Sequence, residues 1–429
     1  MAPGLSIGAG LGQDARVPSL RRALVCASLA GIIAGCAPAG GPHFSATGPD
    51  AEAYGAAQGY RYAVINRQAF YVGQFSEGDA LLESRKIPRS ATPSPLRRAP
   101  AEPALRYEHD GQSRTLDDYL ARQPVTGLLI ARGDTILVER YQYARTDRHR
   151  FTSFSMAKTV TAMLVGIAVA EGRIRSVDDT AAAYVPGLAG TEYGATPLRH
   201  LLQMSSGVRF LETYSGTDDA ARLVNETFIQ TGPGGVETVK PYNLRLRPPG
   251  SRFAYASAET QVLGLVLREA IGRPVADYLH EKIWAPMGAE ADASWFIDRS
   301  GYEATYCCLN AVLRDYARLG LLLARDGRQG SRQLIPRDWL LTATTVRPDD
   351  WHLKPYAATS FYGYGYQTWI LPGPRRMFAL LGVHGQAIFV DPASQLVMVH
   401  TAVMLQPADL LLEARALWQG AVAALGTRD

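Results

Sequence analysis

Cysteine is scarce in this chain, with four in 429 residues. Cys26 and Cys36 lie in or directly after an apolar N-terminal stretch, so only the adjacent pair Cys307-Cys308 remains for the rest of the chain. Adjacent cysteines rarely bridge, and we therefore expect a buried, apolar, unbridged pair. C-x-x-C, H-x-x-x-H and H-x-H spacings are also missing. The sequence therefore predicts no zinc site and no other metal or cofactor.

A strong charge of either sign is missing too. The formal net charge is +4 at pH 7, and the lysines and arginines are scattered. Proteins that bind nucleic acid usually gather basic residues on one face, so this pattern argues against a nucleic-acid partner. With 47% hydrophobic and 20% charged residues, the chain is neither disordered nor fibrous and can bury a large core.

The apolar run at residues 23–35 is too short to span a bilayer as a helix. It follows two arginines, as the core of a signal peptide does, and residues 1–36 are predicted to be a cleaved signal. The last four residues, IAGC, resemble the lipobox of bacterial lipoproteins. That resemblance implies a diacylated Cys36 that anchors the protein by lipid alone in the cell envelope. Because Ala37 follows, it also implies the outer membrane, facing the periplasm. The alternative is an ordinary signal peptide in which Cys36 is incidental.

Composition divides the rest of the chain. Residues 37–59 are rich in Ala, Gly and Pro and are predicted to be a flexible tether. Residues 60–106 form an N-terminal extension, in which the stretch 86–103 holds five prolines and should run extended over the surface. One domain is predicted at 107–429, with a mostly helical lobe at about 173–298.

The chain is organised around residues 151–172, FTSFSMAKTVTAMLVGIAVAEG. Between residues 160 and 170 only Thr161 is polar, which predicts a helix buried on nearly all sides. Gly172 is placed to end it. A strand hairpin is predicted just before it, at 126–144, with its turn at Gly133-Asp134.

Ser155 and Lys158 lie three residues apart at the start of this helix and so share one face of its first turn. Serine is a poor nucleophile unless a neighbouring group takes its proton, and a lysine whose pKa is lowered by burial can do so. The pattern S-x-x-K is short, however. Taken alone, it is equally explained by a helix-capping serine and a solvated lysine.

Further elements can be predicted downstream. A helix is expected at 259–271 with a stop at Gly272, and near the C-terminus the pattern changes to strands joined by short turns, which predicts an antiparallel sheet. The expected strands lie within 362–371, 376–383, 387–391 and 396–402, and an amphipathic helix at 408–425 is expected to cover one sheet face. The fold class is therefore α+β.

Three separated motifs follow one another in order: Ser155-x-x-Lys158, Tyr255-x-Ser257, and Val383-His384-Gly385-Gln386. Their order and spacing resemble those of the penicillin-recognising serine hydrolases of the class C β-lactamase type, which include esterases and 6-aminohexanoate-dimer hydrolase. The likeness runs from about residue 107 to 425. It also takes in Arg314-Asp315-Tyr316-Ala317-Arg318 and Tyr362-Gly363-Tyr364-Gly365.

The resemblance implies a β-lactamase-like fold, with an antiparallel sheet flanked by helices, a helical second lobe and the active site between them. It implies a serine hydrolase that cleaves an amide or ester of a small molecule through an acyl-serine. Ser155 would be the nucleophile, Lys158 its base and Tyr255 the proton shuttle. Ser257 replaces a more frequent Asn and can bond the lysine or the substrate. The backbone N–H groups of Ser155 and Gln386 would form the oxyanion hole.

The sequence also departs from this family. It has no K-T-G motif and no S-D-N motif. If Gly385 is aligned with the glycine of K-T-G, Val383 takes the place of the lysine. If the alignment is shifted by one residue, His384 takes that place. A β-lactam carboxylate would then lack its usual cation. Glu212 and Tyr214 lie in a stretch that resembles the substrate loop of the dimer hydrolases, so these two residues, with Ser257, His384 and Gly385, are the expected substrate contacts.

Two other classes remain open at this point. One is a β-lactamase or a cell-wall D-Ala peptidase that binds penicillin. The other is a catalytically idle envelope lipoprotein, against which the intact Ser155, Lys158 and Tyr255 argue. The sequence does not specify the acyl group, the leaving group or the oligomeric state.

Overall fold

The computed structural model describes residues 71–229, 233–404 and 411–426. The expected signal peptide with Cys36, the tether and the first part of the N-terminal extension lie outside these residues. No helix within the described ranges has the length and apolar character needed to cross a membrane.

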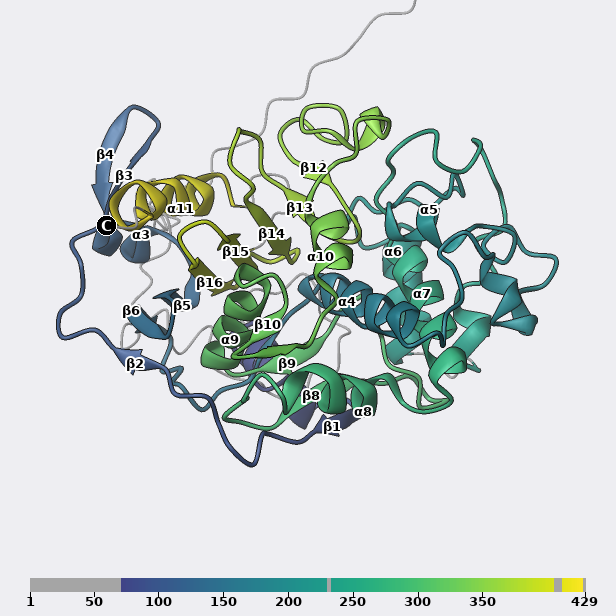
Figure 1. Cartoon of the computed structure of the whole chain (residues 1–429), viewed down its shortest axis with the longest axis horizontal. Coiled ribbons are helices and arrows are strands. Elements are labelled where there is room, and N and C mark those ends of the chain that lie inside the picture. Colours follow the sequence, from purple (N-terminus) through teal and green to yellow (C-terminus); the bar gives the residue numbers. More distant parts are fainter. Residues whose placement is uncertain (1–70, 230–232, 405–410, 427–429) are drawn as a thin grey trace, which may run out of the picture. The chain divides into compact units, whose positions relative to one another are not determined.

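An eight-stranded sheet forms the centre of the domain (Figure 1). Its strands are antiparallel neighbours except for the edge strand β2, which pairs in parallel with β6. In spatial order they are β12 (Gly363–Tyr364), β13 (Trp369–Ile370), β14 (Phe378–Leu381), β15 (Ala387–Asp391), β16 (Leu396–Ala402), β5 (Val125–Arg132), β6 (Thr135–Tyr141) and β2 (Arg97–Arg98). The predicted hairpin is confirmed as β5 and β6, which pair up to Arg132 and Thr135 around the Gly133-Asp134 turn.

Alternate residues of the strands point to opposite faces, and each face has its own helices. Leu128 and Ile130 of β5 pack with α3 (Leu116–Arg122) and α11 (Leu412–Leu425). Leu129 and Ala131 join the larger core formed with α4 (Met156–Ala170), α9 (Leu313–Ala324) and α10 (Arg337–Thr344). The sheet therefore lies between two helical layers, and α4 is buried as its apolar sequence predicts.

A mostly helical lobe packs against α4 and carries a second, smaller sheet. Its helices are α5 (Leu198–Leu202), α6 (Asp219–Val224), α7 (Ser257–Ile271) and α8 (Val275–Leu279), and α7 lies directly on α4. The small sheet is antiparallel, in the order β1 (Ser84–Ile87), β8 (Ala293–Phe296), β9 (Leu309–Ala311) and β7 (Phe151–Thr152). Two hairpins, β3 (Arg106–His109) with β4 (Gln112–Thr115) and β10 (Arg328–Gln329) with β11 (Arg332–Gln333), complete the strands.

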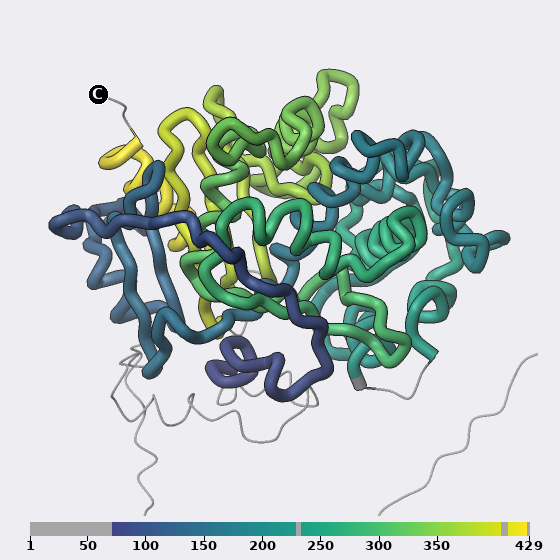
Figure 2. Tube along the Cα trace, turned by 60° about the horizontal axis from the view of Figure 1, so that its bottom comes forward, coloured from purple at the N-terminus to yellow at the C-terminus, as the bar shows by residue number. Residues whose placement is uncertain are grey.

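The proline-rich stretch 86–103 is more firmly attached than its composition suggests. It runs across one side of the domain (Figure 2), as expected, but β1 ties its first residues into the small sheet and β2 ties its second half into the large sheet. Between them the Ser94 carbonyl accepts hydrogen bonds from the Arg318 guanidinium at 2.7 and 3.0 Å. Before it, α2 (Tyr71–Ser76) packs against β7, close to the start of α4.

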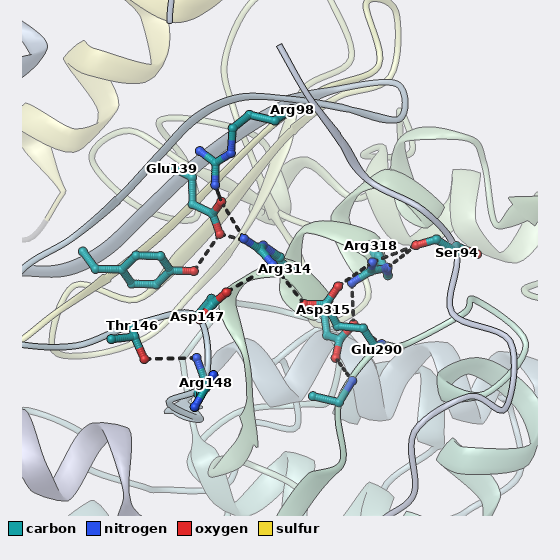
Figure 3. Close-up of polar contacts among 12 residues, drawn as sticks. Ser94, Arg98, Glu139, Thr146, Asp147, Arg148, Glu290, Arg314, Asp315 and Arg318 are labelled. Carbon is teal, nitrogen blue, oxygen red and sulfur yellow. Dashed lines mark hydrogen bonds and ion pairs between the residues drawn. The ribbon is translucent and has the colours of Figure 1, made fainter. Parts of the chain in front are cut away.

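A cluster of ion pairs joins this stretch to the main sheet and to α9 (Figure 3). The Glu139 side chain, only 1% exposed, binds Arg98 and Arg314 and accepts the Tyr141 hydroxyl. One turn further along α9, Arg318 pairs with the buried Asp315 at 2.9 Å. Both arginines of the Arg314–Arg318 motif therefore form ion pairs with buried carboxylates, which gives the motif a structural role in this protein.

The expectation of an unbridged cysteine pair is wrong, because Cys307 and Cys308 form a disulfide. They lie in the turn before β9, where Cys308 has a left-handed backbone with φ of 69°. The indole N–H of Trp295 donates to the Cys307 carbonyl at 2.8 Å and helps to fix this turn. The conformation of this turn brings the two cysteine side chains within bonding distance. Residue types alone do not indicate such a conformation.

Candidate active site

The turn between β7 and α4 places Ser155 at the start of the buried helix. The Ser153 N–H donates to the Leu309 carbonyl at 2.7 Å, which fastens the end of β7 to β9. Phe154 follows with φ of 44°, a conformation that is strained for a bulky residue. An edge contact with Phe75, 4.7 Å between ring centres, helps to hold it there. The chain thus reverses sharply just before Ser155.

Ser155 occupies the N-cap position of α4, but its side chain makes no capping hydrogen bond. Instead its Oγ atom accepts from the Nζ of Lys158 at 3.0 Å when the amine is protonated. Lys158 is only 1% exposed. The alternative of a capping serine beside a solvated lysine is therefore excluded.

Lys158 is a buried amine without a carboxylate partner. Besides Ser155, its Nζ donates to the Ser257 hydroxyl and to the Tyr306 carbonyl, each at 2.9 Å. Among the residues that the structure describes, it forms no salt bridge. Burial lowers the pKa of Lys158 from 10.5 to about 8, although the charge of Glu212 opposes this shift. The amine is therefore poised to lose its proton near neutral pH.

Tyr255 lies just before α7, with its ring centre 5.0 Å from the Lys158 Nζ. Its ring stacks on Trp369 at 5.3 Å, so the aromatic strands β12 and β13 hold it in place. Burial raises the pKa of Tyr255 well above 10, while a hydrogen bond with Ser155 lowers it. The phenol is thus a neutral hydroxyl next to both Ser155 and Lys158.

The third motif forms the turn between β14 and β15. Gly385 has φ of 95°, and a side chain there would press on Ala402 and Met404, so glycine is required. The Gln386 side chain accepts from the His384 N–H at 3.0 Å and donates to the Ala402 carbonyl at 2.9 Å. Within the described residues, the backbone N–H groups of Ser155 and Gln386 have no protein acceptor.

His384 is enclosed by aromatic rings. Its ring centre lies 4.9 to 5.0 Å from those of Tyr71, Phe75 and Phe154, and its Nδ1 bonds to the Met404 carbonyl at 2.6 Å. Burial lowers its pKa from 6.5 to about 4. His384 is therefore neutral at physiological pH and cannot act as the missing cation for a substrate carboxylate.

Glu212 and Tyr214 reach the site from the loop before α6. The Glu212 carboxylate accepts from the Ser257 N–H and hydroxyl, both at 2.7 Å, and from the Tyr214 hydroxyl at 2.9 Å. Tyr214 is 38% exposed. The structure thus links six of the predicted site residues by direct contacts, and His384 lines the same cavity as Ser155. The six are Ser155, Lys158, Glu212, Tyr214, Tyr255 and Ser257.

A cavity of about 200 Å³ opens beside Ser155. Several residues that line this cavity are not predicted from the sequence. They are Tyr71, Gln74 and Phe75 of α2, the aromatic residues Phe154, Phe228 and Tyr306, and the two disulfide-bonded cysteines. The sequence signal for α2 is weak and consists of aromatic residues spaced through 60–76. Among the residues that the structure describes, the lining includes Glu212 and Asp218 but no lysine or arginine. The described part of the chain contains no cluster of three or more His, Cys, Asp or Glu residues that could hold a metal.

Comparison with known proteins gives a family match and several related structures. The family model described as Beta-lactamase matches residues 113–420. The 6-aminohexanoate-dimer hydrolase of Paenarthrobacter ureafaciens is 27% identical over 317 residues, which is 70% of this chain and 78% of that protein. A provisionally named 6-aminohexanoate-dimer hydrolase structure from Bacillus anthracis superposes with a TM-score of 0.73 at 21% identity, over 83% of this chain and 93% of that one. A family VIII carboxylesterase superposes with a TM-score of 0.55 at 17% identity, over 72% and 95%. The predicted α+β, β-lactamase-like fold is confirmed.

Proposed function

Since the chain belongs to the beta-lactamase family of serine hydrolases, we propose that it cleaves an ester or amide bond through an acyl intermediate on Ser155. The observation that carries this proposal is the 3.0 Å contact between the Ser155 Oγ and the buried amine of Lys158, which forms no ion pair among the described residues. In the first step the Ser155 oxygen bonds to the substrate carbonyl carbon while its proton passes to Lys158.

Tyr255 is proposed to carry that proton to the leaving group. Because its phenol stays protonated, it can donate to the departing oxygen or nitrogen and then regain a proton from Lys158. Water next attacks the acyl carbon and gives up a proton to the same groups, and Ser155 leaves with a proton restored. The backbone N–H groups of Ser155 and Gln386, which have no protein acceptor within the described ranges, are proposed to stabilise the oxyanion in both steps.

The substrate is proposed to be a small ester or amide whose part in the cavity is uncharged or cationic and largely apolar. Supporting this, the cavity walls are aromatic and aliphatic, their charged residues are acidic, and His384 is neutral. Tyr214, His384 and Gly385 would contact it. A carboxylate, as in β-lactams, would find no countercharge among the described residues that line this cavity. The relative from P. ureafaciens supports an amide with an aminohexanoate-like chain as a candidate.

A substrate screen tests this proposal. The purified soluble part would be given p-nitrophenyl esters of short fatty acids, aminohexanoate oligomers and nitrocefin. We expect turnover of the esters or the oligomers and little turnover of nitrocefin. Nitrocefin turnover close to that of a dedicated β-lactamase, or stable labelling by a fluorescent penicillin, would contradict the proposed substrate class.

We also propose that Cys36 is lipidated and anchors the enzyme in the cell envelope at the outer membrane. The support is the IAGC sequence at the end of the short apolar run. The variant Cys36→Ala should move from the membrane pellet to the soluble fraction on cell fractionation. A variant that stays in the pellet as firmly as the parent would contradict the lipid anchor.

A further inference from the structure

We propose that Glu212 is a positioning residue: it orients the Ser257 hydroxyl so that the electron pair of the Lys158 amine can point only at Ser155. The inference rests on the proposed function, in which Lys158 is the base. It assigns to Glu212 a task in the proton transfer itself, in place of the substrate contact that the sequence predicts for this residue.

The Glu212 carboxylate fixes the proton of Ser257. Its Oε1 lies 2.7 Å from the Ser257 Oγ, and its Oε2 lies 2.7 Å from the Ser257 N–H. A carboxylate accepts hydrogen bonds and does not donate them. The Ser257 hydroxyl proton therefore points to Glu212. Its oxygen can then meet Lys158 only as an acceptor.

The contacts of Lys158 then fix the direction of its electron pair. A neutral amine has two N–H bonds and one electron pair. The Tyr306 carbonyl, 2.9 Å away, can only accept, and Ser257, also at 2.9 Å, has its proton turned toward Glu212. These two acceptors take both N–H bonds. The one direction left for the electron pair is toward the Ser155 Oγ at 3.0 Å.

Without Glu212, the electron pair of Lys158 would no longer be directed only toward Ser155. The Ser257 hydroxyl could rotate and donate its proton to Lys158, which would occupy the electron pair and leave an N–H facing Ser155. Burial removes other choices, because Lys158 is 1% and Ser257 4% exposed. The arrangement that cannot accept the Ser155 proton would then compete with the productive one.

The charge of Glu212 has a second, separable effect. The groups that face the Lys158 amine are the rings of Tyr255 and Tyr306, at 5.0 and 5.7 Å, and the carboxylate of Glu212 beyond Ser257. Glu212 is the group whose charge raises the pKa of Lys158 against the effect of burial. Its neutralisation should move the pH midpoint of activity downward, whereas the loss of orientation should lower the plateau rate.

The test is a double-mutant cycle on the full chain with Glu212→Gln, Ser257→Ala and the double variant, using p-nitrophenyl acetate. We expect Glu212→Gln to lower kcat at high pH roughly tenfold, to shift the pH midpoint downward and to change KM little. In the Ser257→Ala background the same change should have little further effect on kcat, because Glu212 acts through Ser257.

Glu269→Gln is the matched control. It removes the same charge from the far end of α7, about 18 Å from Ser257 by the rise of the helix, and it should leave both kcat and the pH midpoint unchanged. Circular dichroism would check that each variant folds. If Glu212→Gln does not fold, Ser257→Ala alone decides: an unchanged plateau kcat in that variant contradicts the inference.

Two further results would overturn the inference. One is a Glu212→Gln variant with raised KM and unchanged kcat, or an equal loss in both backgrounds, since Glu212 would then contact the substrate directly. The other is no change in kcat or pH midpoint. Failure of the proposed function would look different, because Ser155→Ala would then retain activity. An inactive Ser155→Ala beside a parental Glu212→Gln rejects only the role of Glu212.

Discussion

Two clusters of buried polar side chains in this domain differ in whether their charged groups form ion pairs. Around Glu139, every buried charge has a partner: the carboxylate binds two arginines and the Tyr141 hydroxyl (Figure 3). Around Lys158, a buried amine touches two hydroxyls and a carbonyl and forms no ion pair within the described chain. Paired charges hold the N-terminal extension and α9 to the sheet, whereas the unpaired amine has a lowered pKa.

The difference between the two clusters distinguishes charged groups that stabilise the fold from a charged group that is proposed to take part in the reaction. A paired buried charge has a fixed protonation state, and the removal of one partner exposes the cost of burying the other. An unpaired buried amine is costly to protonate, and this makes it a useful base. Both clusters come from motifs of the same family resemblance, Arg314–Arg318 for one and Ser155-x-x-Lys158 for the other. Sequence motifs alone do not distinguish the two roles.

The largest effect is expected at the Lys158 cluster. Ser155→Ala, Lys158→Ala and Tyr255→Phe should each lower kcat for an ester about a hundredfold or more, with Ser155→Ala the most severe. Because the three groups act as a unit, the double variants should lose little more than the single ones. Thermal unfolding should be nearly unchanged. Fully additive losses would contradict the shared proton path.

The opposite pattern is expected at the Glu139 cluster. Glu139→Ala removes a buried carboxylate that accepts hydrogen bonds from two arginines, so it should lower the free energy of unfolding by about 2 kcal/mol while the folded enzyme keeps its kcat. Denaturant titration measures the first and ester assays the second. Glu102→Ala, which breaks the more exposed pair with Arg140 at 2.9 Å, is the control; it should cost less than about 1 kcal/mol. Equal losses in the two variants would contradict the importance of burial.

The smallest effect is the pH dependence of the parental enzyme. The pKa of Lys158 is about 8, below its ordinary value of 10.5, so the base form exists above pH 8 and disappears below it. The kcat/KM for an ester should therefore fall about tenfold per pH unit below the midpoint and level off above it. Measurements from pH 6 to 10, with fluorescence to check folding, would reveal this. A flat profile, or a midpoint above pH 10, would contradict a lysine base tuned by burial.

Much of this site could be predicted from the sequence because its side chains sit in short local patterns. Ser155 and Lys158 share a helical turn, and the buried helix, the hairpin before it and α7 follow from periodicity and glycine stops. The α+β class followed from the pattern of strands and helices, and the β-lactamase-like fold followed from the resemblance. Roles tied to side-chain type at a fixed spacing are therefore accessible without coordinates.

The rest depends on contacts between distant segments. The Tyr306 carbonyl that binds Lys158 is a backbone atom and leaves no mark on residue type. Two of the three rings that enclose His384 come from α2, more than three hundred residues earlier in the chain, and burial lowers the pKa of this histidine to about 4. The Cys307-Cys308 bridge depends on a turn fixed by Trp295. Tertiary packing decides each of these.

The most direct test of the central claim is to trap the acyl position. The enzyme would be treated with a p-nitrophenyl phosphonate, digested and analysed by mass spectrometry, with Ser155→Ala and Lys158→Ala treated in parallel. The account predicts one adduct, on Ser155, that forms much more slowly in Lys158→Ala and is absent from Ser155→Ala. An adduct on another residue, or an unchanged labelling rate in Lys158→Ala, would contradict it.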